Sequence, residues 1–153
     1  AGAPLGEKYL ARLAQYEAMT PLDYGRARAK SMTAPGCDPQ ILEDFARIAA
    51  ETRKEGLEAA ARVVSEADNR SHFADLDMPV LVLAGDLDQT VPKALTEELV
   101  EAIPGQLPSF VLHYLPGVGH APYMEDANLY NAVLGDFLSS LHNTWSLRAT
   151  DST

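Results

Sequence analysis

Residues 79–92 read PVLVLAGDLDQTVP, and residues 109–122 read SFVLHYLPGVGHAP. Each stretch begins with a short apolar run and then breaks at glycine and proline, which is the pattern of a strand followed by a loop. The first run has no polar alternation, as expected of a strand covered on both faces of a parallel sheet. Between them, residues 93–103 have helical spacing, with Leu95 and Leu99 expected to face inward. The order strand, helix, strand predicts a right-handed parallel crossover.

Polar side chains follow both predicted strands at the point where each strand ends. Asp86 and Asp88 come after the first strand, and His120 comes after the second. Open α/β sheets place their chemistry at these carboxyl ends, so a carboxylate and an imidazole are expected to meet there. Taken singly, Asp88 could cap the following helix, and His120 could be a loop histidine bound to backbone.

The motifs around these residues are similar to those in the last third of an α/β-hydrolase. Residues 85–92 match the pattern G-x-x-D-x-x-x-P, and residues 117–120 match G-x-G-H. The resemblance is to small capped members such as enol-lactonases, arylesterases and cofactor-free haloperoxidases. It implies that Asp88 is the acid and His120 the base of a Ser-His-Asp triad. Asp88 is preferred to Asp86 because the acid in this family stands three residues after the glycine and four before the proline.

The resemblance also implies a fold and an activity. The expected fold class is α/β, a partial α/β-hydrolase fold with a helical cap followed by the final β-α-β-α unit of a parallel sheet. The implied reaction is hydrolysis of a small carboxylic ester or lactone, and it needs no cofactor. Val91 and Ala121 flank the pair and are candidates for lining the substrate pocket, although ordinary packing also explains them. Nothing in the sequence identifies the substrate itself.

The chain departs from the family in one large respect, since it contains no Gly-x-Ser-x-Gly segment. None of its serines lies in the strained, glycine-flanked turn that presents a hydrolase nucleophile. We therefore interpret the chain as the carboxyl-terminal half of a serine hydrolase, inactive alone. A sheet of two strands is not independently stable, so the expected partner is the amino-terminal half that carries the serine. A homo-oligomer that covers the sheet edge is the other possibility.

The chain divides into three parts by pattern. Residues 1–75 predict a cap of four short amphipathic helices, residues 76–142 the hydrolase core, and residues 143–153 a polar tail. A small helical bundle explains the first part equally well. The four cap helices are expected at 7–19, at 21–32, after Asp38-Pro39, and at 57–68 beyond an interruption at Gly56. Ile48 and Val64 are expected on inward faces, and Glu125 and Asp126 at the start of a terminal helix that ends near Leu141.

Composition excludes several classes of function. The chain has 153 residues and a formal net charge of −10, which argues against nucleic acid as a partner. No apolar run approaches the ~20 residues of a membrane span. The single cysteine, Cys37, fits a reducing cytoplasm. The four histidines lack metal-ligand spacing, and the apparent calcium loop at 86–97 has Val91 where glycine is required.

One alternative comes from a different class of protein. The chain could be a non-catalytic module derived from an α/β-hydrolase, whose pocket holds a small ligand without turnover. The cations Arg26, Arg28 and Lys30 could attract a carboxylate, but a solvated helix face explains them as well.

Overall fold

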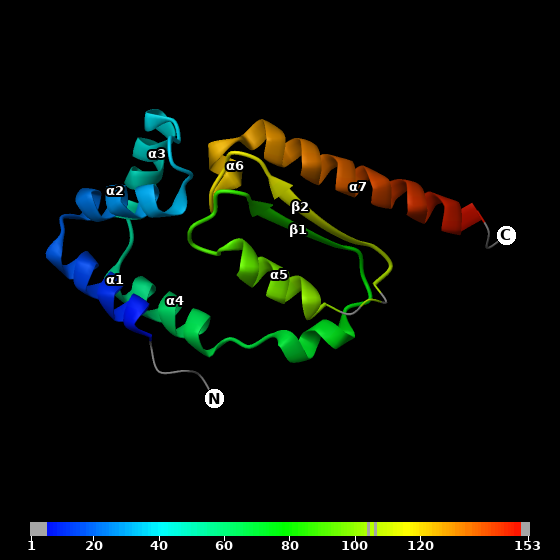
Figure 1. Ribbon diagram of the computed structural model, residues 1–153, viewed down its shortest axis with the longest axis horizontal. Helices are drawn as coiled ribbons and strands as arrows, with labels where there is room; N and C mark the ends of the chain where they lie inside the picture. Colours follow the sequence, from blue (N-terminus) through cyan, green and yellow to red (C-terminus); the bar gives the residue numbers. More distant parts are fainter. Residues whose placement is uncertain (1–5, 104, 106, 151–153) are drawn as a thin grey trace.

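The computed structural model describes residues 6–103, 105 and 107–150, and its elements follow the expected order closely (Figure 1). Four helices come first, then a short 3₁₀ helix, then two strands that alternate with helices. The elements are α1 (Glu7–Ala18), α2 (Pro21–Met32), α3 (Pro39–Ala50), α4 (Lys54–Glu66), η1 (Arg70–Asp75), β1 (Val80–Gly85), α5 (Lys93–Glu101), β2 (Phe110–Leu115), α6 (Pro122–Glu125) and α7 (Ala127–Thr150). We call α1 to α4 the four-helix segment.

Local chemistry sets the starts of α2 and α3. Thr20 precedes α2, and its hydroxyl oxygen accepts a hydrogen bond from the Asp23 backbone amide at 3.3 Å. Asp38 precedes α3 and accepts from the Gln40 amide at 2.7 Å. Proline occupies the first helical position in both cases, where its missing N–H costs nothing.

Helices α2 and α3 pack closely because small residues line their contact. A Cβ atom on Gly25 would lie 2.1 Å from the Ala46 carbonyl oxygen, so only glycine allows this approach. Ala29 and Ala46 are fully buried beside Phe45, and together with Ala121 they form a hydrophobic core cluster. This cluster joins the four-helix segment to the loop after β2.

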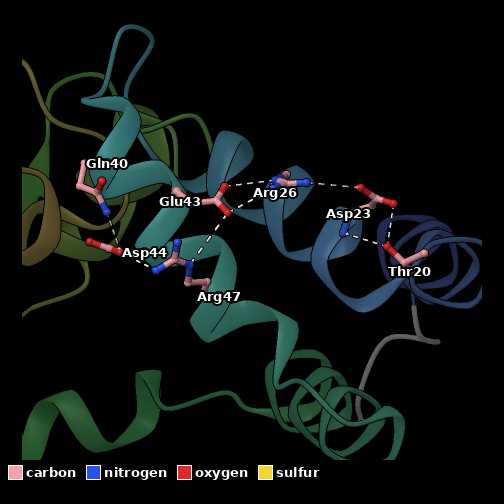
Figure 2. Close-up of polar contacts among 7 residues, drawn as sticks. All are labelled: Thr20, Asp23, Arg26, Gln40, Glu43, Asp44 and Arg47. Carbon is pink, nitrogen blue, oxygen red and sulfur yellow. Dashed lines mark hydrogen bonds and ion pairs between the residues drawn. The ribbon is translucent and has the colours of Figure 1, made fainter.

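The outer surface of α2 and α3 carries a chain of polar contacts (Figure 2). The Arg26 guanidinium donates two hydrogen bonds to the Glu43 carboxylate, both at 3.1 Å. Asp23 lies at one side of this pair, and Arg47 bridges Glu43 to Asp44 at the other. These side chains are largely exposed, so they add little stability compared with the glycine and alanine packing beneath them.

The two strands pair in parallel, in register from Val80 opposite Phe110 to Gly85 opposite Leu115. Helix α5 lies against one face and α7 against the other (Figure 1). The α/β fold class is therefore confirmed, with a two-stranded parallel sheet within the described residues. Every residue of β1 before Gly85 is only half buried, although its sequence predicts cover on both faces.

Several local expectations were wrong. Gly56 does not interrupt the helix but lies inside α4, because the break falls earlier, at residues 51–53. Ile48 is 65% exposed and Val64 is 80% exposed, since α3 buries Phe45 and Ala46 instead and α4 buries Leu57. On α5, Leu95 is 53% exposed.

The terminal helix also differs from the expectation. Helix α7 continues past Leu141 to Thr150, where a polar tail was expected from residue 143. Residues 151–153 of that expected tail lie outside the described residues.

Candidate functional site

The site is built by two loops that leave the carboxyl ends of β1 and β2, which end side by side at Gly85 and Leu115. A Cβ atom on Gly85 would lie 2.1 Å from the Gly119 carbonyl oxygen and 2.3 Å from that of Val118. Glycine at this position therefore lets the loop after β2 cross directly over the end of β1. The Leu87 amide donates to the Val118 carbonyl at 3.0 Å and joins the two loops.

The structure brings Asp88 and His120 into contact. The Asp88 Oδ2 atom lies 2.8 Å from His120 Nδ1. The aspartate side chain is 8% exposed and the imidazole 33% exposed, so the carboxylate is covered while the ring reaches the surface. When Nδ1 carries the proton that is donated to Asp88, Nε2 becomes a proton acceptor.

The other oxygen of Asp88 fixes the acidic loop itself. Oδ1 accepts hydrogen bonds from the backbone amides of Thr90 at 2.7 Å and Val91 at 2.9 Å. These bonds form the local turn typical of aspartate, and no side chain caps the start of α5. The loop amides that bind Oδ1 thus orient the Asp88 carboxylate independently of its contact with the imidazole.

Asp86, the competing carboxylate, has a different partner. Its Oδ1 atom accepts from the Gly117 amide at 2.7 Å and so joins the two loops at their base. Of the two aspartates, the structure places Asp88 against His120. The roles of Asp88 as the acid and His120 as the base remain a prediction.

The predicted pocket residues have different surroundings. Val91 lines a cavity of about 240 Å³ together with Asp88, His120, Leu95 and other residues of β1 and α5. Ala121 is fully buried and belongs to the core cluster with Ala29, Phe45 and Ala46. Packing therefore accounts for Ala121, whereas Val91 stays a candidate for substrate contact.

The end of α2 touches both loops. The Thr90 hydroxyl donates to the Ser31 carbonyl at 3.1 Å, and the His120 backbone amide donates to the Met32 carbonyl at 2.9 Å. These loop groups satisfy carbonyls that the last turn of a helix leaves without intrahelical partners. The four-helix segment is therefore hydrogen-bonded to the loop that carries Asp88 and to the loop that carries His120.

Sequence reasoning missed the importance of Glu125. It was expected only to begin the terminal helix, but its carboxylate accepts hydrogen bonds from the backbone amides of Ala34, Gly119 and Ala121. The only signal in the sequence was an acidic residue shortly after a glycine-rich loop. The partner at Ala34 lies 91 residues away in the chain, and no local pattern predicts such a contact.

The other candidate groups do not converge on the pair. Arg26 binds Glu43, and Arg28 donates to the Ser31 hydroxyl at 3.0 Å. Burial, with Arg12 nearby, lowers the pKa of Arg28 from its usual value. Among the described residues, no group of three or more His, Cys, Asp and Glu side chains is arranged to hold a metal ion.

Comparison with known proteins identifies the family to which this chain belongs. A sequence model described as the dienelactone hydrolase family matches residues 44–135, which is more than half of the chain and includes both site loops. The chain belongs to this family. The predicted kinship with the α/β-hydrolase superfamily is thereby confirmed.

Curated relatives of this family member include methyl ester esterases. The chain is 31% identical over 85 residues to a pimeloyl-[acyl-carrier protein] methyl ester esterase of Xylella fastidiosa, covering 56% of this chain and 32% of the relative. It is also 31% identical over 106 residues to one from Neisseria meningitidis, covering 69% of this chain and 38% of the relative. The match thus spans only about a third of each relative's length.

Solved structures support the same fold. An esterase from Exiguobacterium antarcticum superposes with a TM-score of 0.74 at 16% identity, covering 87% of this chain and 48% of that protein. A bromoperoxidase from Bacillus anthracis gives 0.65 at 25% identity, covering 77% and 44%. A thermophilic esterase from Thermogutta terrifontis gives 0.70 at 20% identity, covering 93% and 54%. In the described part of this chain, no helix is long and apolar enough to cross a membrane.

Proposed function

We propose that Asp88 and His120 are the acid and base of a Ser-His-Asp triad that hydrolyses small carboxylic esters or lactones. The observation that carries this proposal is the 2.8 Å contact between Asp88 Oδ2 and His120 Nδ1, at the carboxyl ends of adjacent parallel strands. In such a triad the carboxylate holds the imidazole tautomer, and Nε2 takes the proton from the serine hydroxyl. The covered aspartate and the imidazole that is one-third exposed suit these two roles.

We further propose that the serine belongs to a polypeptide segment that pairs with the free edge of β1. His120 lines two cavities along that strand, one beside Leu81 and α7 and the other beside Val82 and α5. A parallel strand added at this edge would bring its own carboxyl end next to the Asp88 and His120 loops and would cover the exposed edge of β1. The segment could lie on the same polypeptide or a separate chain, and a second copy of this chain is the alternative cover for the edge.

The division of the chain follows from the same proposal. Residues 1–75 would act as the cap over the pocket, residues 76–142 as the part of the core that holds the pair, and residues 143–153 as its terminal extension. The direct bonds from the end of α2 to both site loops support a cap that forms one wall of the pocket. Val91 would contact the substrate from the cavity that it lines with Asp88 and His120, between β1 and α5.

The names of the relatives suggest a class of substrate. Curated relatives act on a methyl ester of a carrier-bound acyl chain, and several structural neighbours are esterases. We therefore propose a carboxylic ester as the first substrate class to test, with lactones second. The reaction proposed here uses only side chains and water.

The test begins with intact mass spectrometry of the purified protein, to find any companion polypeptide that carries the serine. The assembled protein is then assayed with aryl esters, methyl esters and lactones. His120→Ala should lower kcat by about 10⁴-fold or more, because the base is lost. The matched control is His113→Ala, which removes an exposed histidine of β2. An assembled protein that binds esters without turnover would favour the non-catalytic module, and esterase activity that survives His120→Ala would contradict the role of His120 as the base.

A further inference from the structure

A single carboxylate, that of Glu125, holds the loop that carries His120. Its Oε1 and Oε2 atoms both lie 3.0 Å from the Gly119 amide nitrogen, and Oε1 also accepts from the Ala121 amide at 3.2 Å. Glu125 therefore binds the residues on either side of His120. The amide of His120 itself donates to the Met32 carbonyl at 2.9 Å. Three consecutive amides of the loop are thus fixed by partners outside it.

The same carboxylate reaches the four-helix segment. Oε2 accepts from the Ala34 amide at 2.6 Å, just beyond the end of α2. Two distant parts of the chain, the loop after β2 and the loop after α2, are joined through one side chain. The approach is close, because a Cβ atom on Gly119 would lie 2.6 Å from the Ala34 nitrogen.

The chemistry of the contact requires an ionised carboxylate. A carboxylate has only acceptor sites, enough for three amide donors at once, and its charge strengthens each bond. Glutamine of the same shape presents one acceptor oxygen and an NH₂ group that would face a backbone N–H. At least one of these part-buried amides would then lose its partner, and the loop would have to move to recover it.

We infer that Glu125 is a positioning residue that holds the His120 loop against both the Asp88 loop and the end of α2, so that Nδ1 stays on the Asp88 carboxylate. This inference rests on the proposed function, since position matters most if His120 is a base. Glu125 does not contact the cavity beside Asp88. It lines a separate cavity of about 250 Å³ with Cys37 and Gly117, and it acts through His120.

The test reads the position of His120 without requiring turnover. A histidine Nδ1–H bonded to a carboxylate gives a strongly downfield proton resonance, which His120→Ala assigns by its loss. In the purified protein, with any companion polypeptide present, Glu125→Gln should broaden or abolish this resonance. Glu101→Gln, the same change on α5, should leave it intact. Where the assembled protein has esterase activity, Glu125→Gln should lower kcat tenfold or more with little change in KM.

The opposite result would overturn the inference: a folded Glu125→Gln chain, checked by circular dichroism, that keeps the resonance at the same position and width. If Glu125→Gln does not fold, Glu125→Asp decides. Its shorter side chain keeps the charge but cannot span Ala34 and Gly119 together, and an unchanged resonance there would also overturn the inference. Because the resonance does not depend on catalysis, a failure of the esterase proposal would appear separately, in the His120→Ala assay.

Discussion

The contact between α2 and α3 and the strand pair differ in how completely they bury their own apolar residues. In α2 and α3, Tyr24, Ala29 and Ala46 are at most 2% exposed. In β1, five consecutive apolar residues are only half buried, and Leu95 of the adjacent helix is more than half exposed. Short helices with small residues close their own contact, whereas a central strand needs neighbours on its edge and both faces.

The comparison indicates that the stability of this chain and its proposed catalysis depend on different regions of the molecule. Tight packing is concentrated where α2 meets α3, and the polar pair lies where the less covered strands end. The two regions are joined by hydrogen bonds that Thr90 and His120 donate to the carbonyls of Ser31 and Met32, and by one that Glu125 accepts from the Ala34 amide. Variants that affect one region and spare the other can test this separation.

The largest effect is expected from Asp88→Asn. The asparagine can hold its loop but not the correct imidazole tautomer, so the esterase kcat of the assembled protein should fall about 10⁴-fold. The change in the free energy of unfolding should be much smaller than the change in activation free energy that this loss of kcat represents. Asp86→Asn is the matched control, because its remaining oxygen can still accept from Gly117. Equal losses in both variants would contradict the assignment of the acid.

The next largest effect is expected from Phe45→Ala in the four-helix segment. Removing this buried ring should lower the free energy of unfolding by about 3–5 kcal/mol, measured by urea denaturation. Ile48→Ala on the same helix removes a side chain that is 65% exposed, and it should cost about 0.5 kcal/mol or less. If Ile48→Ala were as costly as Phe45→Ala, Ile48 would be covered by a partner in solution.

A smaller effect is expected at the contact between the two regions. Gly119→Ala would force the loop after β2 away from Thr33 and Ala34, and should cost about 1–3 kcal/mol of unfolding free energy. Gly56→Ala is the contrast, because nothing lies within 4 Å of an added Cβ inside α4. Alanine there should stabilise by about 0.5–1 kcal/mol. A neutral Gly119→Ala would mean that the two regions are held apart in solution.

The sequence predicted the strands, helices and site loops because their signals are local. Glycine, proline and apolar runs mark the strand ends, and Asp88 and His120 stand at fixed positions in those loops. Helix faces were harder, since the periodicity of α3 and α4 includes Ile48 and Val64 but does not tell which side meets a neighbour. The role of Glu125 depends on a contact with Ala34 across the tertiary structure. No local pattern in the sequence predicts a contact between residues so far apart in the chain.

The smallest effect is expected at Cys37, which lies beside the joined loops. Burial, and then the nearby Glu125 carboxylate, raise the pKa of the Cys37 thiol above its usual value. The folded thiol should therefore ionise at a higher pH than the thiol of the urea-unfolded chain. As pH rises above the unfolded value, the unfolded state ionises first, so the folded state should lose a little stability.

The measurement is the pH profile of thiol labelling, whose midpoint gives the pKa and whose plateau gives the access of the reagent. Glu125→Gln should lower the midpoint, because a neighbouring negative charge is gone, and Glu101→Gln should not. A lower midpoint together with a higher plateau would show that the variant opens the loop and reduces the burial of Cys37. A lower midpoint with an unchanged plateau instead places the Glu125 charge beside Cys37 in solution, at the contact that joins the four-helix segment to the His120 loop.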